Sequence, residues 1–534
     1  MQLNGRVHTT VPAELIDRIR HDLDRAGYTV PAVAELWGEE AEAALHRSQR
    51  LSAVRRLRGA PSTPLVTLAR LFVLGETVAR EAAEAAFPAS GLDALERSGL
   101  LGSAQLGSAQ LGTDSPGDGD VDLRDGVRAL IDLRPYSFID ARGAGSWWIA
   151  SDLGEMVLGR ALDEDHVLGI GGATTTLIGL MLPRPVGRAL DIGTGCGVQA
   201  MHASRLADVV VATDISERAL RFARFNAALN GIDGIEFRHG SMYEPVAGER
   251  FDLIVTNPPF VITPRTADVP AYEYRDGGLV GDGIVELVVR GAVEHLAPGG
   301  MLQMLGNWEY TAAEAGMDRL ASWAVGVEHW VIERELQDPA EYAETWIRDG
   351  GTHEGTRAFD GLYDAWLDDF ERRGVRRIGL GYVLLRRPSD DGPNRRVPLR
   401  RTERLHTALT SVPAGLGSHL SDALAGWDAQ NTLDDDALRA TRLRVAPDVT
   451  EERHYWPGAE DPTVMALRQG AGFGRAVPLD TGLAAFVGAC DGELAVGVIV
   501  DALAELLDAD AAALEGSLLP RVRELMADAI LVIA

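Results

Sequence analysis

The stretch Phe251-Asp252-Leu253-Ile254-Val255-Thr256-Asn257-Pro258-Pro259-Phe260 decides the fold of this chain. Its first six residues form an apolar run with the length and composition of a buried strand. Two consecutive prolines cannot continue a parallel strand, so the chain must leave the sheet after Asn257. Open α/β sheets bind ligands where the carboxyl ends of their strands meet. The stretch therefore predicts an α/β domain with a binding site at residues 257–260.

The four residues after this strand offer a specific chemistry. The side-chain oxygen of Asn257 and the carbonyl of Pro258 can each accept a hydrogen bond from an NH2 group. The ring of Phe260 can cover a flat substrate. Two such acceptors orient a planar amino group and return electron density to its nitrogen, and they strengthen as positive charge develops. We therefore expect Asn257, Pro258 and Phe260 to be catalytic, and Pro259 to contact the substrate.

A glycine-rich turn upstream is the second part of the predicted site. Residues 188–192 form a short apolar strand, which Gly193-Thr194-Gly195-Cys196-Gly197 follows before a predicted helix. Glycines at such a turn let the backbone approach a ligand above a helix N-terminus. The next predicted strand, 209–213, ends at Asp214, whose carboxylate is placed to bind ribose hydroxyls. This ordered set of motifs favours a ligand site over a simple tight turn.

With these motifs, residues 186–306 resemble a class I S-adenosylmethionine-dependent methyltransferase that modifies amino groups. The pattern is similar to the methyltransferase small domain group, which includes rRNA guanine-N2 and tRNA adenine-N6 enzymes, and to HemK-type release-factor glutamine methyltransferases. The resemblance implies a Rossmann-like, seven-stranded domain that binds S-adenosylmethionine. It assigns Asn257, Pro258 and Phe260 to the target amine. It implies as cofactor-binding residues Asp191, Gly193, Thr194, Gly195, Gly197, Asp214 and Asn257.

One position departs from the pattern of these relatives. Many of them carry an acid after the third strand, where it binds the adenine amino group. Here residues 235–239 lead into Gly240-Ser241-Met242. Ser241 or a backbone group must therefore bind the adenine.

The bulk properties bound the remaining possibilities. A chain of 534 residues is too long for one core, so three or four domains are expected. We expect a cytoplasmic protein without a membrane span, because no run of eighteen apolar residues and no signal-peptide pattern occurs. Two cysteines, Cys196 and Cys490, give neither a metal-site spacing nor a disulfide framework. The net charge of −28 argues against non-specific nucleic-acid binding by the whole surface.

The chain divides into three predicted parts. Residues 1–152 form an N-terminal part, in which three helices and two strands, 127–133 and 146–151, suggest a winged helix with a low-complexity insertion at 101–120. Residues 153–390 form the methyltransferase domain. Residues 391–534 form an acidic helical domain that begins in an arginine-rich segment. From 405 onward this part has twenty acids and eight arginines.

The C-terminal part ends in a helix–helix–helix–strand pattern, which is compatible with a second winged helix. Its would-be recognition helix, 511–519, contains no arginine. We therefore interpret this part as a structural or protein-contacting module.

Two arginine-rich tracts are candidates for binding RNA phosphates. Residues 46–58 carry five arginines and no acid. The alternative is a solvated helix face paired with the acids at 39, 40 and 42. Residues 371–404 hold eleven arginines against four acids. This tract is an RNA backbone track or a set of salt bridges to the acidic C-terminal part.

Further segments are expected near the substrate. The loop 261–282 is predicted to be an irregular lid that contacts the substrate through Arg265, Tyr272 and Tyr274. By analogy with relatives, the glycine-rich segment 167–176 should close over the cofactor. Paired tryptophans at 147 and 148 either stack a base or fill a domain interface.

Three functions remain open from the sequence. The first is N-methylation of an exocyclic base amine in rRNA or tRNA, which the arginine tracts and Phe260 favour. The second is methylation of a glutamine amide on a protein such as a release factor, although such relatives usually carry Tyr after the prolines. The third is a small-molecule or non-enzymatic role. No metal and no dedicated general base are expected. The sequence does not define the oligomeric state.

Overall fold

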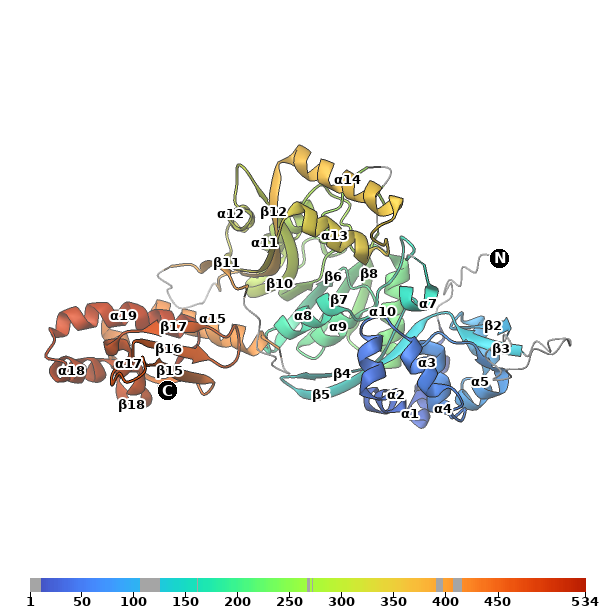
Figure 1. The fold of residues 1–534 in the computed structure, drawn as a ribbon, viewed down its shortest axis with the longest axis horizontal. Helices are drawn as coiled ribbons and strands as arrows, with labels where there is room; N and C mark the ends of the chain where they lie inside the picture. Colours follow the sequence, from blue (N-terminus) through green and yellow to red (C-terminus); the bar gives the residue numbers. More distant parts are fainter. Residues whose placement is uncertain are drawn as a thin grey trace.

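The computed structural model describes residues 11–105, 125–160, 162–266, 269–270, 272–389, 397–406 and 415–534. Figure 1 shows three units, with the central sheet between a blue N-terminal unit and a red C-terminal unit. Most of the predicted low-complexity insertion, together with Arg395 and Arg396 of the second arginine-rich tract, lies outside the described residues.

The central unit is built on one eight-stranded sheet with the order β13-β11-β12-β10-β9-β6-β7-β8. Its strands are β6 (Val186–Ile192), β7 (Ala207–Asp214), β8 (Ile235–His239), β9 (Phe251–Thr256), β10 (Leu296–Thr311), β11 (Glu328–Gln337), β12 (Val375–Arg386) and β13 (Arg400–Arg404). Strands β8, β7, β6, β9 and β10 are parallel, whereas β12 runs antiparallel to both of its neighbours. The chain winds outward in both directions from β6, so the switch point lies between β6 and β9.

Helices cover both faces of this sheet (Figure 1). Helices α11 and α12 pack on one face, while α8 and α9 pack on the other. The helices of the unit are α7 (Glu155–Leu158), α8 (Gly172–Leu180), α9 (Val198–Ala203), α10 (Glu217–Leu229), the 3-10 turn η3 (Glu244–Val246), α11 (Gly283–His295), α12 (Gly316–Trp323), α13 (Pro339–Asp349) and α14 (Arg357–Arg373). Because β6 and β9 are buried between these layers, each supplies apolar side chains to both faces, with Leu190 and Ile254 on one face and Ala189 and Leu253 on the other.

The sheet corrects two of the sequence predictions. It has eight strands instead of seven, because β13 adds to the free edge of β11 in parallel. The predicted domain boundary at residue 390 is therefore too early, since the sheet continues to Arg404. Strand β11 was not predicted at all. It was missed because its sequence does not identify it as a strand until the neighbouring strands β12 and β13 are known.

The N-terminal unit combines helices with a small sheet in the order β1-β3-β2. Its elements are α1 (Ala13–Ala26), α2 (Val30–Leu45), α3 (Leu51–Leu57), α4 (Pro64–Leu68), the π-helical turn η1 (Ala69–Val73), β1 (Val78–Ala79), α5 (Arg80–Ala86), α6 (Leu92–Arg97), β2 (Leu101–Gln105) and β3 (Asp125–Ala129). The predicted insertion begins too early, because β2 occupies its first five residues and pairs with β3.

A long hairpin, β4 (Asp132–Asp140) and β5 (Gly143–Ser151), joins this unit to the sheet. The strand predicted at 127–133 is split between β3 and β4, so only its last residues, Asp132 and Leu133, pair with the strand predicted at 146–151. The paired tryptophans lie at this interface. The indole N–H of Trp148 donates to the Tyr28 carbonyl at 2.7 Å, and the Trp147 ring packs on His202 at 4.7 Å. This arrangement fits a domain-interface role better than base stacking.

The C-terminal unit contains two three-stranded sheets, β18-β14-β19 and β15-β16-β17. Its elements are α15 (Gly417–Thr432), α16 (Asp435–Ala440), β14 (Arg442–Val445), β15 (Val449–His454), β16 (Val464–Gln469), β17 (Ala476–Leu479), α17 (Thr481–Gly488), β18 (Asp491–Ala495), α18 (Val496–Leu506), α19 (Ala511–Ala527) and β19 (Leu531–Ile533). The predicted helix–helix–helix–strand order is present from α17 to β19, except that the unpredicted strand β18 lies between α17 and α18. The β15–β17 meander was not predicted.

Most described arginines of the 371–404 tract make intramolecular contacts. Arg386 pairs with Glu328 at 2.6 Å and with Asp428 at 2.8 Å, and Arg401 pairs with Asp528 at 2.5 Å. Asp428 and Asp528 belong to the C-terminal unit, so these bridges fix that unit to the sheet. The tract therefore follows the salt-bridge alternative at these positions. Arg376 and Arg400 remain exposed.

Candidate active site

The end of β9 presents an unsatisfied polar atom. The Thr256 hydroxyl donates to the Ile192 carbonyl at 2.8 Å, which joins the carboxyl ends of β9 and β6. The next residue is Asn257. Its Oδ1 atom is buried and accepts no hydrogen bond from any described residue. Pro258 is buried behind it, and Pro259 and Phe260 are half-buried. A buried amide oxygen without a donor is costly, so this atom is available to a ligand's N–H.

The glycine turn after β6 is open to a ligand. The amides of Gly193 and Thr194 both donate to the Thr213 carbonyl at 2.9 Å, which positions the turn against β7. Gly193 and Gly195 have φ values of 69° and 56°, and a Cβ on either would meet no atom within 4 Å. Gly197 differs, because its Cβ would lie 2.9 Å from Ala223 of α10. The first two glycines thus leave space, whereas Gly197 permits close helix packing.

Two carboxylates flank this turn. Asp191 is 1% exposed and accepts a 2.6 Å hydrogen bond from the Thr194 hydroxyl. Burial, reinforced by the nearby charge of Asp214, raises the pKa of Asp191 to about 7. Asp214 accepts from the Gly195 amide at 2.9 Å and from the Ser216 amide at 2.8 Å. Burial also raises the pKa of Asp214. The structure therefore brings together the predicted cofactor residues of β6, β7 and the turn.

The next predicted site residue is Ser241, which follows β8 at the expected adenine-binding position. Ser241 is half-buried, and its hydroxyl donates to no described residue. Its neighbour His239 is linked to the Ile215 carbonyl by a 2.8 Å contact through Nε2. Sequence reasoning missed Ile215, a 63% exposed apolar side chain directly after Asp214. Its position next to Asp214, the acid predicted to bind ribose, was the available signal.

Hydrogen bonds hold part of the predicted lid in place. Phe260 forms an antiparallel bridge with Asp276, and the Val261 amide donates to the Arg275 carbonyl at 2.9 Å. The Asp276 carboxylate also accepts from the Tyr272 amide at 2.6 Å. These bonds fold the loop back on the Asn-Pro-Pro-Phe turn. The described residues of 261–282 form no helix or named strand, so the loop is irregular as predicted. Its role as a substrate lid stays a prediction.

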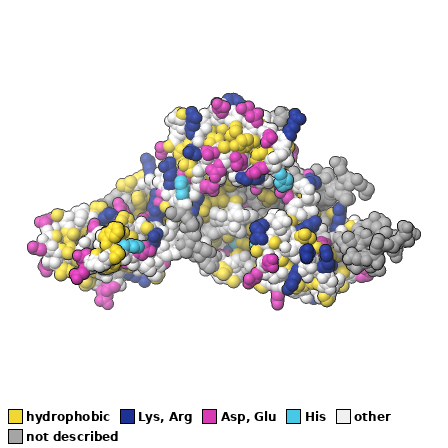
Figure 2. Space-filling view, in the orientation of Figure 1, with side chains coloured by type: hydrophobic (Ala, Val, Ile, Leu, Met, Phe, Trp, Pro, Cys, Tyr) yellow, Lys and Arg dark blue, Asp and Glu magenta, His cyan; other side chains and the backbone are white. Residues whose placement is uncertain are grey.

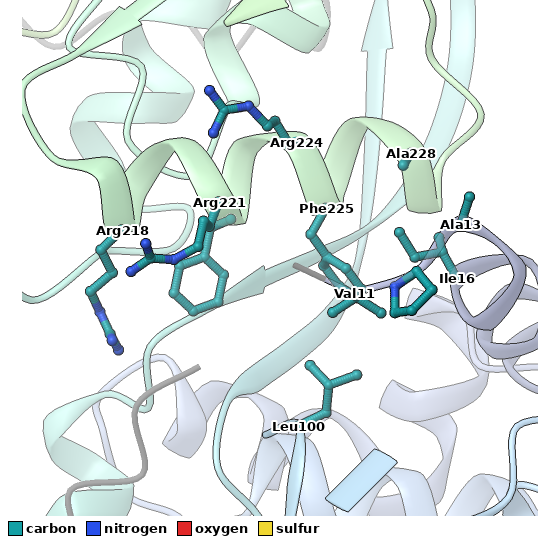
Figure 3. Close-up of a pocket in the computed structure, with 11 residues that line it drawn as sticks. Val11, Ala13, Ile16, Leu100, Arg218, Arg221, Arg224, Phe225 and Ala228 are labelled. Carbon is teal, nitrogen blue, oxygen red and sulfur yellow. The ribbon is translucent and has the colours of Figure 1, made fainter. Parts of the chain in front are cut away.

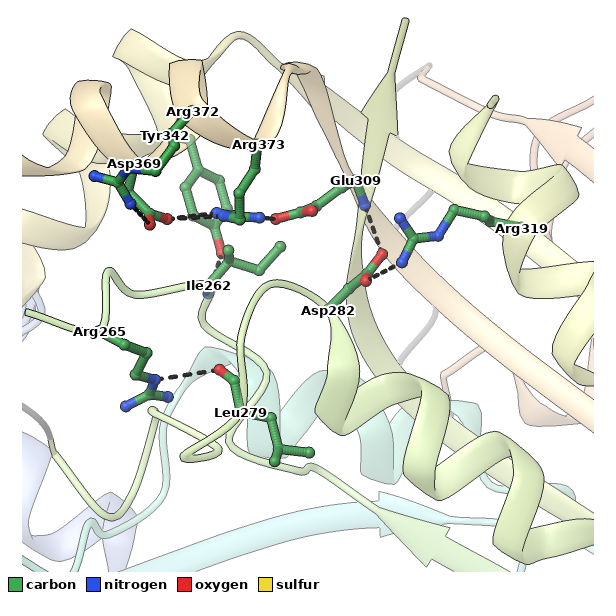
Figure 4. A network of polar contacts seen from close by, with 10 residues as sticks. All are labelled: Ile262, Arg265, Leu279, Asp282, Glu309, Arg319, Tyr342, Asp369, Arg372 and Arg373. Atoms are coloured by element: carbon green, nitrogen blue, oxygen red, sulfur yellow. Dashed lines mark hydrogen bonds and ion pairs between the residues drawn. The ribbon is translucent and has the colours of Figure 1, made fainter. Parts of the chain in front are cut away.

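The three predicted substrate residues lie at different places on this loop. Tyr272 is 7% exposed, and the guanidinium of Arg275 lies over its ring at 4.6 Å. Tyr274 faces His166, with ring centroids 6.1 Å apart. Arg265 donates to the Leu279 carbonyl at 3.2 Å (Figure 4). Among the described residues, no hydrogen bond, ion pair or ring contact joins any of the three to Asn257, so their substrate role stays a prediction.

Helix α13 supplies a residue beside Phe260 that sequence reasoning missed. Trp346 meets the Phe260 ring at a centroid distance of 6.3 Å. Its indole Nε1 is buried and has no hydrogen-bond partner among the described residues.

A polar network supports the same turn from behind (Figure 4). The Tyr342 hydroxyl accepts from the Ile262 amide at 3.0 Å and from the Asn307 side chain at 2.7 Å. Nearby, Arg373 of α14 pairs with Glu309 of β10 and with Asp369. Helices α13 and α14 thus hold the turn through residues that are distant in sequence.

Comparison with known proteins identifies two regions of the chain. Residues 169–324 match the methyltransferase small domain, and residues 25–110 match a domain of unknown function (DUF7059). The first match covers the glycine turn, Asp214 and the Asn-Pro-Pro-Phe turn. This region of the chain is therefore similar to a methyltransferase domain.

Curated relatives have several substrates in their names. A release factor glutamine methyltransferase from Xylella fastidiosa is 38% identical over 24% of this chain and 49% of its own length. A ribosomal protein uL3 glutamine methyltransferase from Bradyrhizobium diazoefficiens is 33% identical over 34% of this chain and 60% of its own. The ribosomal RNA small subunit methyltransferase C of Serratia proteamaculans is 30% identical over 30% and 42%. The chain spans about half the length of the curated relatives it matches.

Among solved structures, a ribosomal protein L11 methylase from Lactobacillus delbrueckii subsp. bulgaricus is 22% identical, with a TM-score of 0.22. The similarity covers 41% of this chain and 81% of the methylase chain. Within the described residues, no helix is long and apolar enough to cross a membrane. In the same part of the chain, no group of three or more His, Cys, Asp or Glu side chains could hold a metal ion.

Proposed function

We propose that this protein is an S-adenosylmethionine-dependent N-methyltransferase that acts on a planar amino group. The residues present fit such a cofactor. Gly193 and Gly195 face open space, and Asp191 and Asp214 offer carboxylates on either side of the turn. Ile215 and Ser241 provide an apolar and a polar group for the adenine. When bound, S-adenosylmethionine supplies an electrophilic methyl group with a built-in leaving group.

The observation that carries this proposal is the unpartnered Oδ1 atom of Asn257 at the switch point of the sheet. An acceptor amine can donate one hydrogen bond to this oxygen and a second to the carbonyl of Pro258. These bonds orient the nitrogen lone pair and strengthen as the nitrogen becomes positive. Phe260 and Trp346 can enclose a flat group and exclude water. The chain's part in the reaction is thus positioning and charge stabilisation.

The first test distinguishes the proposed cofactor-binding residues from the proposed amine-binding residues. Asp214→Ala should weaken S-adenosylmethionine binding at least tenfold in calorimetry, since charge-assisted hydrogen bonds contribute about 1.5–3 kcal/mol. Asn257→Ala should leave that affinity nearly unchanged and lower kcat by about 10²–10³, the usual effect of losing one such group. Unchanged affinity in Asp214→Ala would remove that residue from the site. Full turnover in Asn257→Ala would refute the amine-binding role.

For the acceptor, we propose an exocyclic base amine of rRNA or tRNA. The first arginine-rich tract supports this choice. Of its five arginines, Arg50 donates to the Leu74 carbonyl at 2.6 Å. The other four are exposed, and their side chains make no ion pair or hydrogen bond with another described residue: Arg47, Arg55, Arg56 and Arg58. Figure 2 shows basic side chains on this face of the N-terminal unit. Exposed unpaired arginines are suited to phosphate contacts.

A glutamine amide of a protein is the second candidate. Two observations favour it. Several arginines of the second arginine-rich tract form intramolecular ion pairs such as Arg386–Asp428. Fewer of its positive charges are therefore free to bind RNA phosphates than the sequence suggested. Two of the relatives above are named as glutamine methyltransferases. A carboxamide also presents a planar NH2 group to Asn257.

Salt dependence distinguishes these acceptors. Methyl transfer to bulk RNA should weaken with salt, and Arg47→Gln, Arg55→Gln, Arg56→Gln and Arg58→Gln together should flatten the log–log slope by about 0.7–0.9 per lost phosphate contact. The matched control neutralises four exposed arginines of the second tract instead: Arg372, Arg376, Arg377 and Arg400. Methylation of release factors or ribosomal proteins, with no RNA product in nucleoside mass spectrometry, would replace the RNA proposal.

We also propose that the N-terminal unit is a winged helix. The order β1-β3-β2, with α5 and α6 between β1 and β2, supports this. The C-terminal unit has the corresponding order β18-β14-β19, but β14 precedes the helices in the chain. Strands β14 and β19 pair, but α17, α18 and α19 lie between them in the chain, so they do not form a hairpin wing. This supports a structural role for the C-terminal unit.

A further inference from the structure

A second cavity lies between the N-terminal unit and α10, apart from the acids and glycines described above. It has a volume of about 370 Å³. This size falls within the usual range of small-molecule sites. Its walls come from the chain before and within α1, from Leu100 after α6, and from one side of α10 (Figure 3). The apolar lining residues are Val11, Pro12, Ala13, Ile16, Leu100, Phe222, Phe225 and Ala228.

Three arginines of α10 also line the cavity, and they differ in their partners. Arg218 pairs with the Asp152 carboxylate, which neutralises its charge. Arg224 lies 3.8 Å from Glu217, and it projects to the opposite side of α10 from Phe225 (Figure 3). Arg221 projects to the same side as Phe225 (Figure 3). Its Nε atom is buried without a hydrogen-bond partner, and its guanidinium makes no ion pair with another described residue.

The unpaired Arg221 and the apolar walls together indicate which class of ligand fits the cavity. Arg221 offers a planar guanidinium with several N–H donors, and its buried Nε has no partner among the described residues. An unpaired charge beside an apolar wall is stabilised by an anion, and the planar fork of arginine binds carboxylate or phosphate oxygens with two parallel hydrogen bonds. The apolar walls then require an apolar body on the same ligand.

We propose that this cavity is a binding site for a small amphiphilic anion, with its head group on Arg221 and its apolar body against Ile16, Leu100 and Phe225. The site shares α10 with the candidate active site, since α10 begins directly after the Asp214 turn. The proposal does not depend on methyl transfer.

Calorimetric titration of the full chain with sodium decanoate tests this site, and decyl phosphate and decanol serve as comparison ligands. Decanoate or decyl phosphate should bind, and the stronger of the two identifies the head group. Arg221→Met should weaken that binding at least tenfold, because it keeps the apolar stem and removes the charge. The matched control Arg290→Met, on an exposed arginine of α11 outside this cavity, should not change it. Ala13→Phe should fill the mouth of the cavity and abolish binding while thermal unfolding stays unchanged.

Three results would overturn the proposal. The first is the absence of binding by the full chain. The second is equal binding of decanol and decanoate, or unchanged binding by Arg221→Met, because either would show a non-specific apolar contact. The third is binding only in a variant that lacks residues 2–10, which would make the chain's own N-terminus the occupant.

Discussion

The ring of Phe260 meets the indole of Trp346 at a centroid distance of 6.3 Å and an interplanar angle of 77°. Phe260 follows β9, whereas Trp346 lies on α13, in the helical insertion between β11 and β12. The fold therefore places a second aromatic side chain beside the turn that the sequence identified. The buried Nε1 of Trp346 and the buried Oδ1 of Asn257 both lack partners among the described residues. Together they offer one donor and one acceptor to a ligand.

Trp346→Phe should lower kcat/KM for the methyl acceptor. This variant keeps an aromatic ring against Phe260 and removes only the N–H donor. A lost hydrogen bond of about 1 kcal/mol corresponds to roughly a fivefold decrease. Steady-state kinetics and cofactor calorimetry should show this loss without weaker S-adenosylmethionine binding. Wild-type kinetics in Trp346→Phe would restrict Trp346 to packing.

Asp191 should make cofactor binding dependent on pH. Its pKa is raised to about 7 by burial and by the charge of Asp214, so the carboxyl is largely protonated below that pH. A cationic ligand favours the carboxylate and lowers this pKa. Affinity for S-adenosylmethionine should therefore increase as pH rises through about 7, and binding below that pH should release a proton. Calorimetry in two buffers with different ionisation enthalpies measures this release. A pH-independent Kd would contradict the assignment.

Tyr342→Phe should destabilise the turn that follows Phe260. The variant removes the oxygen that accepts from the Ile262 amide and the Asn307 side chain. Leaving these buried donors unpaired should lower the free energy of unfolding by about 1–3 kcal/mol. Tyr363→Phe is the matched control, because the Tyr363 hydroxyl makes only a 3.3 Å contact with Glu344 near the surface. Equal unfolding midpoints for the two variants in urea would refute this role.

Arg386→Met should destabilise the junction with the C-terminal unit. The Arg386 side chain is 7% exposed and bridges Glu328, which is 1% exposed, and Asp428. Removing one partner of a buried ion pair costs about 3–5 kcal/mol. The control Arg377→Met breaks a 3.8 Å contact with Asp338 on an exposed side chain and should cost less than about 1 kcal/mol. Similar denaturation curves for both variants would show that the Arg386 bridges do not hold the units together.

The sequence by itself determined the motifs of the candidate active site. The buried strand before Asn257, the glycine turn and Asp214 are local patterns, and each is encoded within a few residues. Parallel strands in an open sheet bring their carboxyl ends together, so these motifs had to converge once the α/β pattern was recognised. The structure accordingly places Asp191, the glycine turn and Asp214 in contact across β6 and β7.

Only the tertiary structure determined which residues and units surround the candidate active site. A charged run looks the same whether it binds phosphates or acids of its own chain, and the partners of Arg386 and Arg401 lie in a distant unit. Strands β11 and β13 could not be predicted from the sequence for the same reason. The pairing of strands depends on residues that are distant in the chain. Trp346 could not be placed beside Phe260 before α13 was positioned over the sheet. The identity of each of these residues is local, but its role depends on contacts that only folding creates.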